Sequence, residues 1–233
     1  RDAPHLEAIG ARPATVEELS LVHTPALVEA VASTAGLPRV AFDPDTAASA
    51  GSYEAARLAA GGLLNLCEAV LGGEVANGFA LVRPPGHHAE RDRAMGFCIF
   101  NNVAIAAAFL RRRGIGRVAV IDWDLHHGNG TQHTFESDPS VLYVSTHQYP
   151  YYPGTGAAEE VGRGEGAGYT LNVPLPAGSG DAEMSRAFSE IIVPVCRQFA
   201  PEFVLISAGF DADRRDPLGG LEATTPGFAA LAR

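Results

Sequence analysis

Two aspartates and a histidine alternate in the segment Asp122-Trp123-Asp124-Leu125-His126. Alternate side chains of an extended chain share a face, so Asp122, Asp124 and His126 are predicted to point the same way if the extended geometry continues. A carboxylate and an imidazole two positions apart form half of a site for a divalent transition metal. The alternative is that this run only ends a strand and forms ion pairs with arginines.

A further ligand must come from another part of the chain. Asp211 is suited to this role because it follows a separate apolar run in Ser207-Ala208-Gly209-Phe210-Asp211. Two carboxylates and one imidazole leave a coordination position open for water, which is the pattern of catalytic rather than structural zinc sites. Adding Asp211 favours a metal site over strand-ending ion pairs.

Two adjacent histidines, His87 and His88, follow the bend Arg83-Pro84-Pro85-Gly86. Proline restricts the backbone and histidine titrates near neutral pH, so the pair suits general acid–base catalysis. The structural alternative is a pair of loop histidines, one exposed and one packed. The nearby Cys98 lies in an apolar run and is predicted to be a small buried side chain rather than a nucleophile.

The elements that must position these residues can be predicted from apolar periodicity. Strands are predicted at 78–82, 117–122, 141–145, 169–173 and 203–207, and helices at 15–19, 27–31, 52–71, 102–113, 131–136 and 181–199. Apolar strands that alternate with helices predict an α/β fold with a mainly parallel central sheet covered on both faces. Ligands of such sheets bind beyond the carboxyl ends of the strands, where His87–His88, Asp122 to His127, His147 and Asp211 are expected.

Composition limits the class of protein. The chain has 233 residues, of which 46% are hydrophobic and 19% charged, with a net charge of −10. These values predict one globular domain and exclude disorder, and the negative charge argues against direct binding to nucleic acid or an anionic membrane. No apolar run approaches the roughly 20 residues of a membrane span. Three scattered cysteines predict a reduced, cytoplasmic protein, while a chain beginning at Arg1 rather than Met is compatible with a removed leader.

Five segments together resemble the zinc-dependent histone deacetylase superfamily, which also contains acetylpolyamine amidohydrolases. They are Arg83–Ala89, Gly96–Asn102, Asp122–Gly130, Pro153–Gly156 and Ala208–Asp211 with Asp216–Gly219. Asn129 and the run Phe100-Asn101-Asn102 are similar to the class II branch of the family. The resemblance implies a three-layer α/β/α arginase/deacetylase-type fold and a single catalytic domain over residues 1–233. The family's N-terminal opening and its Gly-Gly-Tyr segment are not found in this stretch, so the sheet is expected to be incomplete at its C-terminal end.

The resemblance also implies a role for each matching residue. Asp124, His126 and Asp211 correspond to the zinc ligands, a set that accepts Fe²⁺ as well. His87 and His88 correspond to the tandem catalytic histidines, with His88 the general base and Asp122 the carboxylate that orients His87. The implied substrate tunnel contains Gly96, Phe97 and Tyr152. The implied structural K⁺ site contains Asp122, Asp124, His126, Ser145 and Thr146.

The expected activity is hydrolysis of the acetyl amide of acetyl-lysine side chains or acetylated polyamines; the oligomeric state cannot be read from the sequence. An arginase-like binuclear ureohydrolase is one alternative, but it needs a second Asp where this chain has Gly128, and Asp213 is only a trace of that pattern. A non-catalytic acetyl-lysine binding module is another, because the family's carbonyl-polarising tyrosine is missing: no tyrosine follows Tyr169.

Overall fold

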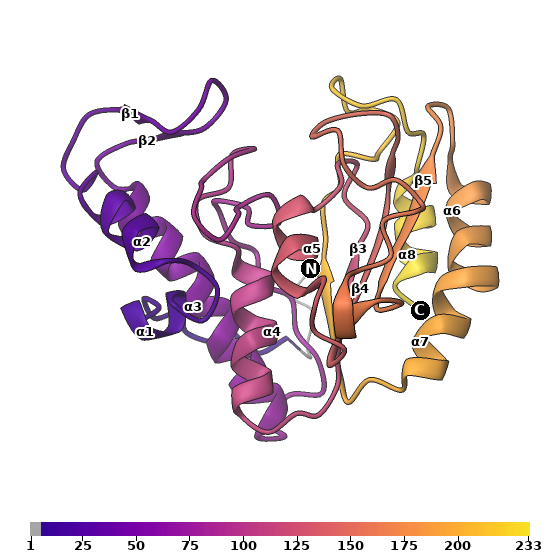
Figure 1. The fold of residues 1–233 in the computed structure, drawn as a ribbon, viewed down its shortest axis with the longest axis horizontal. Helices are drawn as coiled ribbons and strands as arrows, with labels where there is room; N and C mark the ends of the chain where they lie inside the picture. Colours follow the sequence, from indigo (N-terminus) through magenta and orange to yellow (C-terminus); the bar gives the residue numbers. More distant parts are fainter. Residues whose placement is uncertain (1–5) are drawn as a thin grey trace. The chain divides into compact units, whose positions relative to one another are not determined.

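The computed structural model describes residues 6–233, and the chain divides into two compact units, residues 1–110 (unit 1) and 111–233 (unit 2). Figure 1 shows their helices and strands. Unit 1 is mainly helical, whereas unit 2 contains the larger sheet. The candidate histidine pair therefore belongs to unit 1, and the candidate metal ligands belong to unit 2.

Unit 1 contains four helices and two short strands within the described residues, and side-chain caps fix the starts of the first two helices. They are α1 (Val16–Leu19), α2 (Pro25–Ala32), β1 (Val40–Ala41), β2 (Ala47–Ala48), α3 (Ser52–Leu71) and α4 (Asn102–Arg112), which ends two residues past the division. Thr15 and Glu18 form a capping box at α1, and Thr24 caps α2. The α3 residue Gly61 faces the backbone of residues 12–14, where a β-carbon would lie 2.0 Å from the Arg12 carbonyl oxygen.

The predicted strand at 78–82 is not formed. The segment has no strand assignment, and Phe79 and Leu81 are 59% and 88% exposed. An apolar run becomes a strand only when another strand pairs with it, and no ladder among the described residues includes this segment. The apolar pattern therefore indicated a tendency to form a strand. Without a pairing strand among the described residues, the segment has no strand structure.

Unit 2 is built on a parallel sheet with the strand order β5-β4-β3-β6. Its strands are β3 (Val118–Asp122), β4 (Val141–Gln148), β5 (Thr170–Leu175) and β6 (Phe203–Ser207). Asp122 pairs in register with Ser145 on β4 and with Ser207 on β6. Because all three ladders are parallel, the segments after β3 and β6 emerge at the same edge. The predicted parallel sheet is confirmed, although β4 is longer than expected and contains His147, which the sequence analysis had placed beyond the strand.

Helices cover both faces of this sheet. Unit 2 contains α5 (Asn129–Phe135), the short 3-10 helix η1 (Gly164–Gly166), α6 (Asp181–Ala187), the π-turn η2 (Phe188–Ile192), α7 (Val193–Phe199) and α8 (Thr225–Leu231). Figure 1 shows α5 on one side of the sheet and α6, α7 and α8 on the other, which is the expected three-layer α/β/α arrangement. The predicted helix at 181–199 forms with a π-turn inside it. Pro194 follows this turn and has no N–H to donate to a carbonyl of the preceding turn.

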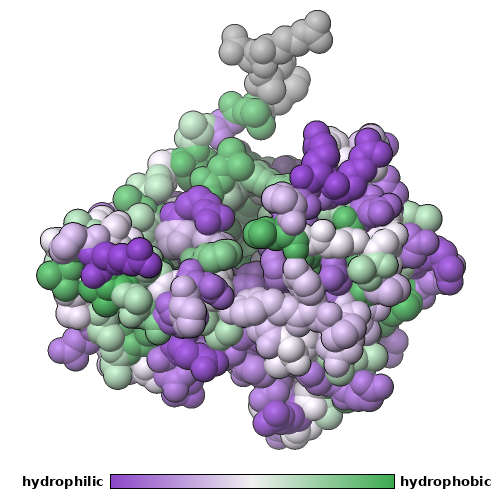
Figure 2. All heavy atoms as spheres, turned by 90° about the horizontal axis from the view of Figure 1, so that it is seen from above, coloured by the Kyte–Doolittle hydropathy of each residue, from purple (hydrophilic) through white to green (hydrophobic). Residues whose placement is uncertain are grey.

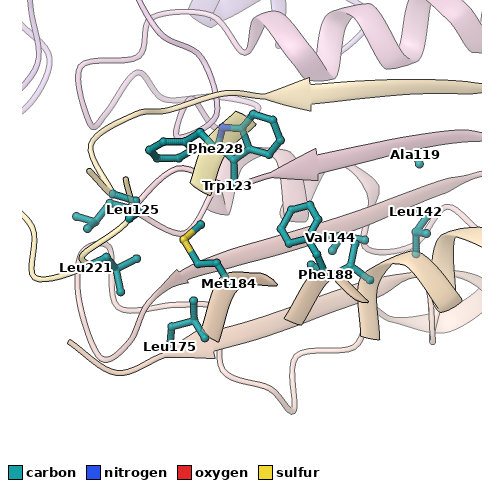
Figure 3. Close-up of a cluster of buried hydrophobic side chains, with 13 residues drawn as sticks. Ala119, Trp123, Leu125, Leu142, Val144, Leu175, Met184, Phe188, Leu221 and Phe228 are labelled. Carbon is teal, nitrogen blue, oxygen red and sulfur yellow. The ribbon is translucent and has the colours of Figure 1, made fainter. Parts of the chain in front are cut away.

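An apolar cluster fills the space between the sheet and the helices α6 and α8 (Figure 3). The ring of Trp123 lies 6.3 Å from the rings of both Phe188 and Phe228. The rest of the cluster comprises Ala119, Leu125, Leu142, Val144, Leu175, Met184, Ile192, Ala212, Leu221 and Ala223. Since Trp123 and Leu125 are anchored here, the intervening Asp124 is held in place by packing on both sides.

One face of the molecule is of mixed polarity. Figure 2 shows hydrophilic and hydrophobic residues interspersed over the face that it presents. Over residues 6–233, no helix combines the length and the apolar character needed to cross a membrane.

Candidate metal centre

Three side chains from two distant segments converge in unit 2. One ligand atom each from Asp124, His126 and Asp211 lies within 4.8 Å of the other two. His126 Nδ1 is 3.1 Å from Asp124 Oδ1 and 2.9 Å from Asp211 Oδ2. All three side chains are partly buried, so the structure brings together the complete set of metal ligands that the sequence analysis predicted.

The backbone reaches this arrangement through turns rather than through an extended strand. Strand β3 ends at Asp122, whose Oδ1 accepts the N–H of Asp124 at 3.1 Å. Asp124 Oδ1 in turn accepts the N–H of His126 at 2.8 Å. Aspartate favours such turns because its short side chain reaches the amide two residues on. The expectation of continued extended geometry was therefore wrong, yet the turns direct Asp124 and His126 to one point.

Asp211 follows β6, the strand that pairs with β3. Its Oδ1 accepts the N–H of Leu125 at 2.9 Å, which ties the segment after β6 to the segment after β3. Gly209 makes this approach possible, because a β-carbon there would lie 1.9 Å from Asp124 Oδ2 and 2.7 Å from Asp124 Cβ. The glycine thus leaves the space that the Asp124 carboxylate occupies.

The donor set fits a transition metal ion. Donors bound to one tetrahedral zinc at about 2.0–2.1 Å lie roughly 3.3 Å apart, close to the separations seen around His126. Burial opposes charge on this imidazole, but Asp124 and Asp211 outweigh it and raise the pKa of His126 to about 9. The concentrated negative charge that produces this shift is what a divalent cation would neutralise.

Two tyrosines flank the ring of His126. The Tyr151 ring stacks on it at 5.7 Å with an interplanar angle of 26°, and the Tyr152 ring meets it edge-on at 6.0 Å. The Tyr151 hydroxyl donates a hydrogen bond to the Leu218 carbonyl. Tyr152 was predicted as a tunnel residue; Tyr151 was missed, although its place beside Tyr152 in the sequence was a usable signal.

Of the residues predicted to hold K⁺, Asp122 ends β3, Ser145 and Thr146 lie within β4, and Asp124 and His126 follow β3. Asp122, Ser145 and Thr146 are all buried, and the Asp122 side chain is fully enclosed. Ser145 Oγ lies 2.9 Å from His147 Nδ1, and Thr146 Oγ1 has no hydrogen-bond partner within the described part of the chain. A buried carboxylate beside oxygen donors is an environment that favours a bound cation.

The predicted catalytic pair lies in unit 1 and is packed rather than loose. His87 and His88 are 5% and 4% exposed, and their ring centroids are 4.0 Å apart. Gly96 has a positive φ of 57°, and a β-carbon there would lie 2.4 Å from His88 Cδ2. The next residue, Phe97, also has a positive φ, of 66°, and its N–H donates to Thr46 Oγ1 at 3.0 Å. The alternative of one exposed and one packed histidine is therefore wrong.

The structure also shows the surroundings of Cys98 and Asp213. Cys98 is fully buried, in agreement with the prediction of a small packed side chain, and all three cysteines are free. Asp213, the trace of a second metal site, is instead paired with Arg215 at 2.8 Å, and hydrogen bonds from Arg215 lower the pKa of Asp213 to about 2. This pairing weakens the arginase-like alternative.

Similarity to known proteins shows which family the chain belongs to. A model of the histone deacetylase domain matches residues 2–233. The chain belongs to the histone deacetylase family. Family membership confirms the resemblance that the five sequence segments indicated.

Relatives within this family cover nearly the whole chain. It is 49% identical over 227 residues to histone deacetylase 15 of Arabidopsis thaliana, with 96% of this chain and 41% of that protein aligned. It is 45% identical over 223 residues to a probable deacetylase of Archaeoglobus fulgidus (94% and 61%) and 46% identical over 242 residues to polyamine deacetylase HDAC10 of Homo sapiens (96% and 35%). The chain thus spans between about a third and three fifths of these relatives.

A solved structure also supports the fold. The crystal structure of the HDA15 HD domain superposes with a TM-score of 0.94 at 49% identity, covering 96% of this chain and 64% of that one. This match confirms the three-layer α/β/α deacetylase-type fold predicted from the sequence.

Proposed function

We propose that the chain forms the catalytic part of a zinc-dependent deacetylase that hydrolyses acetyl-lysine side chains or acetylated polyamines. The observation that carries this proposal is the convergence of Asp124, His126 and Asp211 with ligand atoms within 4.8 Å of one another. Family membership supports the same chemistry. Relatives with names that specify histones or polyamines support acetylated amines as the substrate class.

Asp124, His126 and Asp211 would hold the metal ion. When bound, zinc supplies a Lewis acid that polarises the acetyl carbonyl and lowers the pKa of water toward 7. Fe²⁺ suits the same donors. Leu125 contributes by donating its N–H to Asp211, which keeps that carboxylate aligned with the other two ligands.

The chain's own proton carriers would be the two histidines of unit 1. An imidazole nitrogen of His88 accepts a proton from the attacking water, whose oxygen adds to the acetyl carbon. A histidine of the pair then protonates the amine nitrogen as its bond to the acetyl carbon breaks, which yields acetate and a free amine. Asp122 is assigned to orient His87. The burial of both rings supports this role because it limits competing contact with bulk water.

Phe97 and Tyr152 are proposed as aromatic walls for the apolar stem of the substrate, together with Gly96, which precedes Phe97 in the chain. Both rings are accessible, at 55% and 37% exposure. Aromatic walls suit a neutral acetylated chain, whose charge appears only after deacetylation.

We also assign K⁺ to the buried oxygens around Asp122. A reducing, cytoplasmic setting is supported by the three free cysteines.

The proposal is tested on the full-length protein with an acetyl-lysine fluorogenic substrate and an acetylated polyamine. Asp211→Ala is expected to reduce amine release on the order of 100-fold or more, because one of three ligands is lost. Glu165→Ala, at an exposed carboxylate of η1, is the control and should keep full activity. Elemental analysis should give one transition ion per chain.

Three outcomes would contradict the proposal. Two tightly bound transition ions per chain would favour the binuclear arginase-like enzyme. Binding of acetyl-lysine without release of amine would favour a binding module. Full activity of Asp211→Ala would remove the assigned ligand set.

A further inference from the structure

The segment of residues 149–160, which we call the tyrosine loop, carries at one end the two rings that flank His126. Tyr151 and Tyr152 are each 37% exposed, so packing alone does not immobilise them. The loop has no helix or strand of its own. Its fixed position must therefore come from specific attachments to the rest of unit 2.

The strongest attachment is Glu160, at the far end of the loop. Its Oε1 accepts the N–H groups of Gly156 and Ala157, at 3.0 and 3.1 Å, which closes the loop on itself. Its Oε2 accepts a hydrogen bond of 2.6 Å from Gln132 Nε2, on helix α5. Burial raises the pKa of Glu160, but these donors outweigh it and hold the pKa below its ordinary value. The carboxylate is thus a charged acceptor for three donors.

Gln132 continues this chain of hydrogen bonds into the interior. Its Oε1 accepts from Asn172 Nδ2 at 2.7 Å and lies 2.9 Å from His127 Nε2. Because an amide oxygen can only accept, His127 carries its proton on Nε2, and its Nδ1 accepts from the Thr155 hydroxyl at 2.7 Å. Gln132 and His127 are 2% and 1% exposed. This series of hydrogen bonds therefore returns to the tyrosine loop at Thr155, four residues after Tyr151.

A second attachment fixes the same part of the loop. His147 Nε2 lies 2.8 Å from the Gly156 carbonyl, which can only accept, so this nitrogen donates. Gly156 has a φ of +92°, and a β-carbon there would lie 2.4 Å from His147 Nε2 and 2.6 Å from His127 Cγ. The backbone at 156 is thus seated directly on two buried imidazoles.

We propose that Glu160, Gln132 and His127 form a loop clamp whose task is to hold Tyr151 and Tyr152 against the metal ligand His126. These three are positioning residues, since they act through the tyrosine loop; this inference rests on the proposed function. A clamp built from one charged and two buried polar groups keeps the loop in place although its tip is exposed to solvent. The zinc ligands themselves come from other segments, after β3 and β6.

The test uses Glu160→Ala in the full-length protein, with Glu159→Ala as the matched control because Glu159 is the adjacent, exposed carboxylate. Hydrogen exchange of residues 149–160 is measured on metal-free protein, so this readout does not depend on activity. Glu160→Ala should accelerate exchange in this loop and leave β3 and β6 protected. With acetyl-lysine substrate, KM should rise about tenfold while kcat changes less than about threefold.

A charge swap provides the rescue. Gln132→Glu alone sets two carboxylates against each other. Glu160→Gln alone replaces the carboxylate that accepts from Gln132 with an amide, so one donor or acceptor between positions 132 and 160 has no match. When both substitutions are combined, the amide at position 160 can donate to the carboxylate at position 132 and accept from the N–H groups of Gly156 and Ala157. The carboxylate at position 132 accepts from His127 and Asn172. Loop protection and KM should return toward the wild-type values, although incompletely, because the charge has moved to a more buried position.

The outcomes separate the clamp from the proposed function. If Glu160→Ala matches Glu159→Ala in exchange and KM, or accelerates exchange evenly through β3–β6, or if the swap restores neither quantity, the positioning role is wrong. If the wild-type protein releases no amine but Glu160→Ala accelerates exchange in the tyrosine loop as described, the clamp holds the loop and the proposed deacetylase function fails instead.

Discussion

At the scale of single residues, the candidate metal centre depends on short local contacts. Two aspartates bend the chain after β3 by accepting backbone N–H groups two residues ahead, and Gly209 leaves the room into which Asp124 turns. Each contact is small, but together they bring two carboxylates to within 3.1 Å of one imidazole nitrogen. Any change that displaces Asp124 is therefore expected to act on metal binding before it acts on folding.

Gly209→Ala tests this dependence. The added β-carbon would lie 1.9 Å from Asp124 Oδ2 and 2.7 Å from Asp124 Cβ, so the Asp124 side chain and the backbone that carries it must both move away. Zinc affinity is expected to fall on the order of 10- to 100-fold, measured by competition with a metal-sensitive dye. Gly10→Ala is the control, because a β-carbon there meets nothing within 4 Å. Unchanged affinity in Gly209→Ala would mean that Asp124 is not a ligand.

A second residue-scale prediction concerns His23 in unit 1. His23 Nδ1 lies 2.9 Å from the Glu90 carbonyl, so it carries the proton, and Nε2 accepts the N–H of Asn101 at 2.8 Å. Both ring nitrogens are engaged in the neutral form. Burial lowers the pKa of His23 to about 4, against a backbone hydrogen bond to Glu90 that raises it.

The sign of the resulting pH effect follows from linkage. Above pH 6.5 the ring is neutral in both states and contributes no pH dependence. Between pH 6.5 and about 4 the unfolded chain binds a proton that the folded chain does not, so the free energy of unfolding falls, by up to about 3 kcal/mol from this group. Urea titrations at several pH values should show a shallower decline for His23→Gln. The exposed-site control His133→Gln should follow the wild type; equal slopes for all three proteins would contradict the prediction.

At the scale of elements, parallel pairing and helix ends determine where side chains meet. The register that aligns Asp122 with Ser145 and Ser207 brings the segments after β3 and β6 to one edge. Hydrogen bonds connect the first residue of α6, Asp181, with the N-cap of α8, Thr224. The Thr224 hydroxyl donates to Asp181 Oδ2 at 2.6 Å and accepts the N–H of Gly227 at 3.2 Å, while the Thr224 N–H donates to Asp181 Oδ1 at 2.8 Å.

Thr224→Ala is expected to lower the free energy of unfolding by about 2 kcal/mol, because it removes both the cap of α8 and a hydrogen bond to a carboxylate. Urea denaturation measures the change. Thr224→Ser keeps the hydroxyl and is expected to retain most of the stability. A loss of the same size in Thr224→Ser would show that the methyl group, not the cap, is responsible.

At the scale of the whole molecule, the chain is strongly acidic and divides into two units, with all three candidate ligands in unit 2. Bringing two carboxylates together costs free energy that a bound cation recovers. Metal binding should therefore stabilise the folded state.

Zinc at 100 times its Kd is expected to stabilise the folded protein by about 2.7 kcal/mol and to raise the midpoint of thermal unfolding. Removal of the metal with a chelator should reverse the shift. The shift should be lost in Asp211→Ala and retained in Glu165→Ala. Identical midpoints with and without zinc in the wild type would contradict a resident metal.

The sequence by itself determined the fold class, the strands β3 to β6, the long helix α3 and the identity of the three converging side chains. These were accessible because apolar periodicity, glycine stops and residue chemistry are local properties. Pairing and burial were not. The 78–82 segment is apolar enough for a strand but has no strand partner within the described residues, and the Asp124–His126 segment turns where alternation suggested extension.

Only the tertiary structure showed the hydrogen bonds on which the proposed loop clamp rests, because Gln132, Glu160 and the Asn172 that donates to Gln132 lie far apart in the chain and carry no shared motif. Their hydrogen bonds exist only once helix α5, strand β5 and the tyrosine loop are packed together. The physical reason is that residue type sets what a side chain can bond to, whereas packing decides which partner comes within reach.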